Sequence, residues 1–223
     1  MQRFNLFYMI HKGLRAMMYE LSISLQHTDF AGAADHHHSL EWLEHLLEIF
    51  DAHAGHEDKY VFPLLQACDP ALQDEMEKEH VTDIALSNEL RSLIAAYKNT
   101  TDIAEKRSIG SKICYTYYAY VAFNLTHMNK EETVVNQSLW NNYPDQQIVQ
   151  ANMQMVSAFT PDEVRRNAKW IMRGCSNGDI SGWLGTIKKN APEHVFNLLM
   201  SIAQEELPES RFEKVQNAVM AAA

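Results

Sequence analysis

The stretch HAGHEDKYVFP, residues 53–63, places two histidines and two acidic residues within about one helical turn. His53 and Glu57 are four residues apart, and side chains at that spacing lie on one face of an α-helix. A single pair of this kind is most often a hydrogen-bonded pair on a solvated helix. It gains functional meaning if the same spacing recurs at a matching place in the fold.

Apolar residues recur at three- to four-residue spacing through the first 140 residues, and glycines and prolines are few. This pattern predicts four long helices, over residues 2–28, 36–67, 70–98 and 102–140. Pro63 predicts a kink or an early stop near the end of the second helix. Short loops make successive helices antiparallel, so we expect an all-α, up-down-up-down four-helix bundle.

The same His-x-x-x-Glu spacing recurs near the end of the fourth predicted helix, at His127 and Glu131. The first and third helices each carry one histidine at a similar depth from the same end of the bundle. At 1.5 Å per residue, these histidines lie roughly 14–21 Å from that end. The spacing therefore predicts one core layer of four imidazoles and two carboxylates: His11, His53, Glu57, His80, His127 and Glu131.

This set of side chains suits two divalent transition-metal ions. Two carboxylates can each bridge a pair of ions, and two imidazoles can complete each ion. Imidazole favours iron, zinc or copper, and open coordination positions fit the chemistry of iron with O₂.

Two other metal sites are excluded by local sequence. A zinc-protease helix needs His-Glu-x-x-His, and Tyr60 stands where the second histidine would follow His56 and Glu57. A ferritin-like di-iron bundle needs Glu-x-x-His on two helices. Only the segment ending at His80 has it, because Asn124 stands three residues before His127.

The last part of the chain, residues 145–223, differs from the first 140. The segment TPDEVRRNAKWIMRG begins with a capping-box pattern from Thr160 to Glu163 and ends at Gly174. Shorter helices are expected at about 180–190, 192–206 and 208–221. We therefore expect a four-helix bundle domain over 1–140 and a C-terminal helical extension over 145–223.

Composition narrows the possible partners. A formal net charge of −10 argues against binding to a phosphate backbone, so no nucleic-acid partner is expected. No long uncharged apolar run predicts a membrane span. Three widely spaced cysteines fit a reducing cytoplasm better than a disulfide framework. The sequence does not identify a protein partner.

Four motifs together resemble the hemerythrin-like (HHE cation-binding) family. They are IHKGLR around His11, HAGHEDKYVFPLL around His53, EKEHVTD around His80, and THMNKEETVVNQSL around His127. The resemblance covers roughly residues 1–140. It implies a bundle holding two non-haem iron ions with an oxo or hydroxo bridge, and it assigns the six residues of the predicted layer as ligands.

The sequence departs from the oxygen-carrying members of that family. Those members have a fifth histidine one turn before the third-helix ligand, where this chain has Met76. They also use a longer His-to-Asp spacing on the fourth helix. The set of four histidines and two glutamates is more similar to di-iron proteins linked to iron–sulfur cluster repair and nitric-oxide stress, which carry an additional cysteine-bearing N-terminal region.

Several large side chains lie a turn or two from the predicted ligands. Their simplest role is core packing, and the alternative is a pocket lining that limits access to the metals. The candidates are Tyr8, Tyr60, Met76, Tyr120 and Phe123. Asp58 and Lys59 are expected to be solvated charges.

The sequence thus predicts a di-iron protein that binds or reacts with O₂, peroxide or NO, as a sensor, carrier or stress-response protein. Two alternatives stay open. One is a di-iron oxidase or peroxidase-like enzyme, and the other is an interaction protein that responds to its metal.

Overall fold

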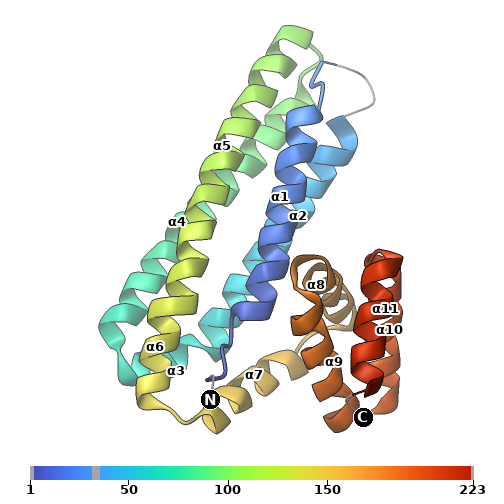
Figure 1. Ribbon diagram of the computed structural model, residues 1–223. Coiled ribbons are helices and arrows are strands. Elements are labelled where there is room, and N and C mark those ends of the chain that lie inside the picture. The colour runs from blue at the N-terminus through green and yellow to red at the C-terminus, as the bar shows by residue number, and fades with distance from the viewer. Residues whose placement is uncertain (1–2, 32–35, 222–223) are drawn as a thin grey trace. The chain divides into compact units, whose positions relative to one another are not determined.

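The computed structural model describes residues 3–31 and 36–221, which form helices and, over these ranges, no strand. Figure 1 shows the helices in chain order. Their bounds are α1 Tyr8–His27, α2 His36–Tyr60, α3 Phe62–Cys68, α4 Pro70–Asn99, α5 Ile103–Lys130, a π-helix Glu131–Val135, α6 Asn136–Asn142, α7 Asp145–Ser157, α8 Pro161–Gly174, α9 Asn177–Asn190, α10 Glu193–Glu206 and α11 Glu209–Ala221.

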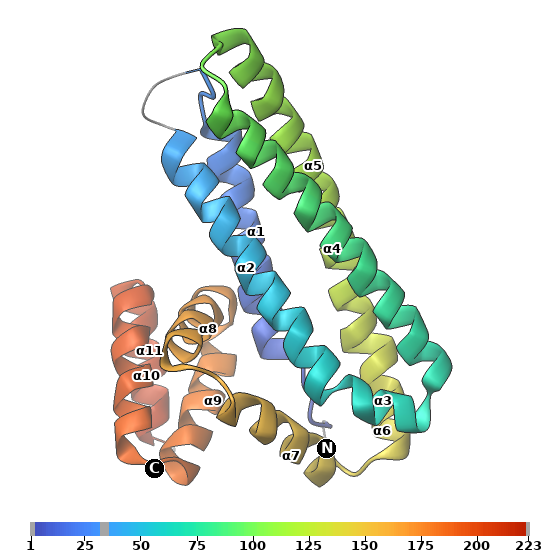
Figure 2. The same ribbon diagram turned by 180° about the vertical axis from the view of Figure 1, so that it is seen from behind.

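The prediction of an all-α, hemerythrin-like bundle is confirmed. Helices α4 and α5 run side by side in both views (Figures 1 and 2). Within the first unit, the second half of α1 contacts α2, where the Ser24 and Ser39 hydroxyls meet. Asp69 caps α4 by accepting a hydrogen bond from the Leu72 amide, and Asp102 caps α5 through the Glu105 amide. The predicted break over 29–35 falls partly on residues 32–35, which lie outside the described residues.

Three predicted helices differ from the structure at their boundaries. The first begins at Tyr8, and the described residues before it are not helical. There, the Arg3 guanidinium donates to the Asp145 carboxylate at 2.5 Å and to the Trp140 and Tyr143 carbonyls at 2.8 and 2.7 Å. These bonds fix Arg3 outside the helix.

The predicted interruption near Pro63 is confirmed, because the helix breaks at Val61.

The fourth predicted helix is not continuous. A π-helix, Glu131–Val135, interrupts it, and the Asn136 amide bonds to the Glu131 carbonyl five residues back. A π-turn inserts one extra residue and thereby turns the following side chains around the helix axis. Helix α7, Asp145–Ser157, was not predicted from the sequence.

Packing divides the structure into two compact units. The first comprises Met18–Met155 together with the segment ending at Leu6, and the second comprises Phe7–Met17 together with the segment beginning at Val156. Helix α1 thus contributes to both units. The sequential boundary expected between 140 and 145 stays a prediction about domains.

The first unit has an apolar core far from the predicted ligands. Leu43, Leu47, Leu90, Ile94 and Ile113 are all at most 2% exposed there. Polar contacts at this end are local. The Tyr97 hydroxyl donates to the Phe30 carbonyl at 2.7 Å, and the Ser24 and Ser39 hydroxyls lie 2.8 Å apart.

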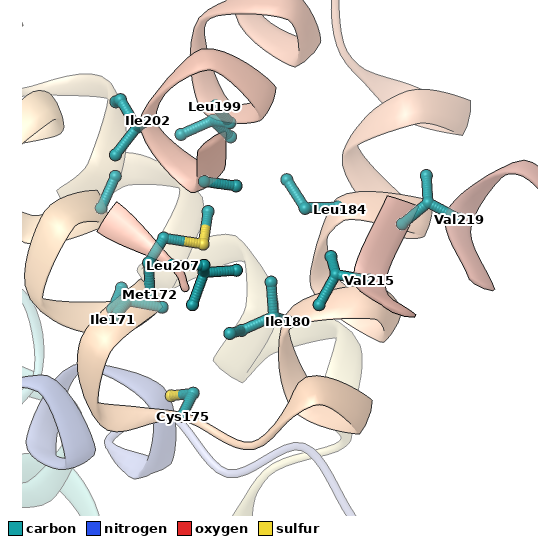
Figure 3. Packing of buried hydrophobic residues seen from close by; sticks show 12 residues of the cluster. Ile171, Met172, Cys175, Ile180, Leu184, Leu199, Ile202, Leu207, Val215 and Val219 are labelled. Carbon is teal, nitrogen blue, oxygen red and sulfur yellow. The ribbon is translucent and has the colours of Figure 1, made fainter. Parts of the chain in front are cut away.

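The second unit has its own apolar core, drawn in Figure 3, where α8 to α11 direct aliphatic side chains toward one another. The predicted capping box at Thr160 is confirmed, and Ser176 and Asp179 form a second one at the start of α9. Met9 and Ile10 of α1 pack against this core.

Two glycines let α1 and α8 approach backbone to backbone within the second unit. A Cβ atom on Gly174 would lie 2.2 Å from the Lys12 carbonyl oxygen, and one on Gly13 would lie 2.9 Å from the Ile171 nitrogen. The Lys12 ammonium also pairs with the Asp179 carboxylate at 2.8 Å. Only residues without a side chain permit this spacing.

No helix among the described residues combines the length and the apolar character that crossing a bilayer requires.

We expect Gly174→Ala to destabilise the second unit by about 1–3 kcal/mol, because the new methyl group displaces the α1 backbone. Gly185→Ala is the control, since nothing lies within 4 Å of its Cβ position in α9. That change should be neutral or stabilising by about 0.4–1 kcal/mol. Urea unfolding of the two variants measures both effects, and equal stability of the two would contradict the close approach.

Candidate metal centre

Four of the predicted ligands come together inside the first unit, each on a different helical segment. Glu57 lies near the end of α2, His80 on α4, and His127 on the last turn of α5. Glu131 is the first residue of the π-helix. All four are buried, at 0–6% exposure. Charged or titratable groups are rarely buried this deeply unless they are paired or bind a metal.

The donor atoms of these four residues face one another. Each residue offers one atom, and these atoms all lie within 4.8 Å of one another. His80 Nε2 is 3.6 Å from the Glu57 carboxylate, and His127 Nε2 is 3.4 Å from the Glu131 carboxylate. His80 Nε2 makes no hydrogen bond in the part of the chain described.

His53 joins the same carboxylates from α2. Its Nε2 lies 3.1 Å from Glu57 Oε1. His53, Glu57 and Glu131 also each offer an atom within 4.8 Å of the others. The two glutamates are therefore shared between a His80–His127 side and a His53 side.

The two inner imidazoles are oriented by carboxylates behind them. His80 Nδ1 donates to Asp58 at 2.8 Å, and His127 Nδ1 donates to Glu79 at 2.7 Å. In the neutral imidazole, a proton on Nδ1 leaves the Nε2 lone pair of each ring available to a cation. Asp58 is therefore not a merely solvated charge, although its side chain is 53% exposed.

Only one of the two carboxylate–imidazole pairs, Glu79 with His127, has a lysine beside its carboxylate among the described contacts. Its ammonium binds Glu79 at 2.6 Å and also binds Glu75. Burial raises the pKa of Glu79, but hydrogen bonds from Lys130 and His127 outweigh it and lower that pKa overall. Glu79 thus stays ionised behind His127.

Aromatic rings pack against both inner imidazoles. Phe62 stacks on His80 with ring centroids 4.9 Å apart, and Phe123 stacks on His127 at 5.9 Å. The break at Val61 places Phe62 at the start of α3. These contacts fix the ring planes and keep the donor layer dry.

The protonation of the layer reflects two close, buried carboxylates. Burial, followed by the charge of Glu57, raises the pKa of Glu131 well above its ordinary value. Burial opposes protonation of His80, but Glu57 and Asp58 outweigh it and raise its pKa to about 9. Burial lowers the pKa of His127.

These observations fit a bound cation. Donors at bonds of about 2.1 Å from one ion lie roughly 3–4 Å from one another, which is close to the observed spacing. Imidazole with carboxylate is a donor set for iron, zinc, copper or manganese. A cation would also relieve the repulsion between Glu57 and Glu131 that otherwise favours protonation.

His11 lies in the first turn of α1, three residues after the helix begins, and not about nine as the predicted boundary required. It is fully buried, and its ring stacks on Phe7 at 5.3 Å within the second unit. Its role as a ligand stays a prediction.

The residues proposed as a pocket lining are placed in different surroundings. Met76 and Tyr120 are fully buried in the first unit, and Phe123 stacks on His127. Tyr60 stacks on His56, with ring centroids 6.4 Å apart. Tyr8 belongs to the second unit and accepts a hydrogen bond from Lys12 at 2.5 Å. Their role in ligand access stays a prediction.

Sequence reasoning did not identify Phe62, Glu79, Lys130 or Asp83 as neighbours of the ligands. Asp83 and Glu79 were detectable in principle. Each lies within one turn of His80, and an acidic residue on the inner side of a bundle helix is unusual. The contacts of Phe62 and Lys130 depend on the breaks and crossings of the helices.

The fold and the site define a class: a helical bundle with buried histidines and glutamates compatible with metal binding. The family model of the hemerythrin HHE cation-binding domain matches residues 4–139, which is more than half of the chain. The chain therefore belongs to the hemerythrin HHE cation-binding family. Neither the search of curated proteins nor that of solved structures gave a match.

The pKa directions predict how the stability of the metal-free protein depends on pH. A raised pKa of His80 contributes stability below pH 6.5 that is lost as the pH rises through about 9. The raised pKa of Glu131 acts in the same direction, because the folded state holds its proton more tightly. We expect the free energy of unfolding to fall by on the order of 3 kcal/mol between pH 6.5 and 9.

Urea unfolding of metal-free protein across this pH range measures the effect. The Glu57→Gln variant is the control, because it removes the negative charge that acts on both groups. If the free energy of unfolding of the wild type falls no more steeply with pH than that of the variant, Glu57 does not raise the pKa values of His80 and Glu131.

We further expect Asp58→Asn and Glu79→Gln to weaken metal binding roughly 10- to 100-fold, because each removes the charge behind a ligating imidazole. Glu75→Gln is the matched control, since Glu75 binds Lys130 and contacts no histidine in the described contacts. Competition with a chromophoric chelator for zinc measures all three affinities. If Glu75→Gln weakens zinc binding as much as the other two variants do, the effect comes from the loss of any nearby negative charge and not from the hydrogen bond to the imidazole.

Proposed function

We propose that this chain binds two non-haem iron ions and uses them to bind or react with O₂, peroxide or NO, as a sensor, carrier or stress-response protein. The single observation that carries the proposal is the sharing of Glu57 and Glu131 between His53 on one side and His80 with His127 on the other. Two carboxylates common to two histidine sets suit a pair of ions. The expected oxo or hydroxo bridge stays a prediction.

His11 completes the proposed set. Helix α1 runs without a break from Tyr8 to His27, and in the first unit the Met18 carbonyl accepts a hydrogen bond from the Tyr117 hydroxyl at 2.9 Å. His11 precedes Met18 by two helical turns and lies on the same helix face. This continuity supports His11 as the partner of His53.

When bound, an iron pair supplies open positions and redox electrons for a small ligand. The chain's own residues do the rest. Glu57 and Glu131 hold negative charge at the centre of the layer, and Asp58 and Glu79 keep the protons of His80 and His127 on Nδ1. Phe62 and Phe123 exclude water from the two imidazoles.

Met76 bears on the choice between reversible binding and reaction. It is fully buried one turn before His80 and offers a thioether in place of an imidazole nitrogen. A centre with one imidazole fewer has one more open position. This favours reaction with the small molecule over clean reversible binding.

The first experiment measures iron per chain by elemental analysis of protein purified without added metal. We expect about two iron ions in the wild type and a sharp loss in Glu57→Gln, because a shared carboxylate serves both ions. Glu48→Gln, an exposed change on the same helix, should retain the wild-type content.

Wild-type protein without bound metal would overturn the proposal. His11→Ala tests the sixth ligand separately, and an unchanged iron content there would remove His11 from the set alone. Titration with NO followed by absorbance then distinguishes stoichiometric binding from turnover by an enzyme.

A further inference from the structure

Helices α4 and α5 of the first unit run side by side and place inward side chains opposite one another (Figures 1 and 2). His80 and His127 form one such pair, with ring centroids 5.0 Å apart. The next pair is Asp83, three residues after His80, and Asn124, three residues before His127. Three residues are nearly one helical turn, so the second pair lies directly beside the two imidazoles.

A buried hydrogen bond joins the second pair. Asn124 Nδ2 donates to Asp83 Oδ1 at 2.6 Å, and it also donates to the Tyr120 carbonyl of its own helix at 3.2 Å. Asp83 is 5% exposed and Asn124 is 3% exposed. Water has little access to the bond, so breaking it would leave polar groups without partners in the core. The bond therefore ties α4 to α5 at this level.

A polar contact between the same helices lies on the other side of the imidazoles. The Lys130 ammonium of α5 binds Glu79 of α4 at 2.6 Å, and it also binds Glu75. Lys130 follows His127 by three residues, whereas Asn124 precedes it by three. The facing histidines thus have one polar contact between α4 and α5 on either side of them.

Beyond Asp83 and Asn124, the inward residues of the two helices become apolar. Leu90 and Ile94 of α4 and Ile113 of α5 are at most 1% exposed. Apolar contacts have no preferred direction, so such layers accommodate small shifts of one helix along another. A hydrogen bond weakens steeply when its distance or angle departs from the optimum. The polar pair is therefore better suited than the aliphatic layers to fix the register of α4 against α5.

Stability alone does not explain a carboxyl group and an amide at these positions. Burying polar groups is costly, and well-packed apolar residues in their place are often neutral or stabilising. The best-attested use of a buried polar residue between helices is to specify their register, at a cost in stability. Here the register that is specified is that of His80 and His127.

We propose that Asp83 and Asn124 are positioning residues of the metal centre, whose hydrogen bond holds His80 and His127 where both can bind one cation. The inference rests on the proposed function, because it needs a cation in the layer. Neither residue is a ligand in this proposal. Without their bond, the cation itself would have to align the helices, and its affinity would fall because the site is no longer preorganised.

Three variants separate the hydrogen bond from the charge of Asp83. The leucine pair, Asp83→Leu with Asn124→Leu, removes both. Asp83→Asn removes only the charge, because an amide oxygen at position 83 still accepts from Asn124. The exchanged pair, Asp83→Asn with Asn124→Asp, keeps the charge and the bond but swaps donor and acceptor between the helices.

Competition with a chromophoric chelator measures zinc affinity, and thermal melting of the metal-free proteins measures stability. We expect the leucine pair to melt at or above the wild-type temperature and yet to bind zinc roughly 10- to 100-fold more weakly. Asp83→Asn and the exchanged pair should bind zinc with nearly the wild-type affinity. A pair that served stability alone would leave the zinc affinity of the leucine pair unchanged.

Cobalt(II) gives a readout of geometry, because its visible absorption bands depend on how the ligands are arranged around the ion. We expect the cobalt bands of the leucine pair to differ from those of the wild type in position or intensity. The exchanged pair should restore the wild-type spectrum, since it restores the bond.

A wild-type protein that binds neither zinc nor cobalt overturns the proposed function and the positioning role with it. A leucine pair with the affinity and the cobalt spectrum of the wild type overturns the positioning role alone. An Asp83→Asn variant as weak as the leucine pair assigns the effect to charge and also overturns it. The same holds for an exchanged pair that binds zinc as weakly as the leucine pair.

Discussion

The structure depends on two carboxylates, Glu57 and Glu131, that face each other in the core of a helical bundle. Burial and mutual repulsion make their ionised forms costly, so the surrounding structure has to supply compensation. Imidazoles from α2, α4 and α5 surround them, and no hydrogen bond occupies His80 Nε2 within the described residues. A bound cation would supply the missing positive charge, and the chain's membership of the hemerythrin HHE cation-binding family agrees with such a site.

The carboxylates that orient His80 and His127 lie in different surroundings. Glu79 behind His127 is bound by Lys130, whereas Asp58 behind His80 reaches solvent. The positive charge of Lys130 stabilises the ionised form of the Glu79 carboxylate behind His127.

The second unit is held together by apolar packing and by close contact between helix backbones. Its core is aliphatic and its contact with α1 depends on glycine, since Gly13 and Gly174 let two backbones meet. Helix α1 belongs to both units, so its packing is decided by two independent cores.

The sequence by itself determined the helical class, a break near Pro63, the capping box at Thr160 and the pairing of His53 with Glu57 and of His127 with Glu131. These follow from periodicity and i, i+4 spacing, which are local. Only the tertiary structure decided the π-turn at Glu131, helix α7, the start of α1 at Tyr8 and the partners of Asp58, Glu79 and Asp83. Arg3 is fixed outside the helix by hydrogen bonds to residues about 140 positions away in the chain. The contacts of those three acids likewise require helices to cross, and spacing along one chain carries no information about such crossings.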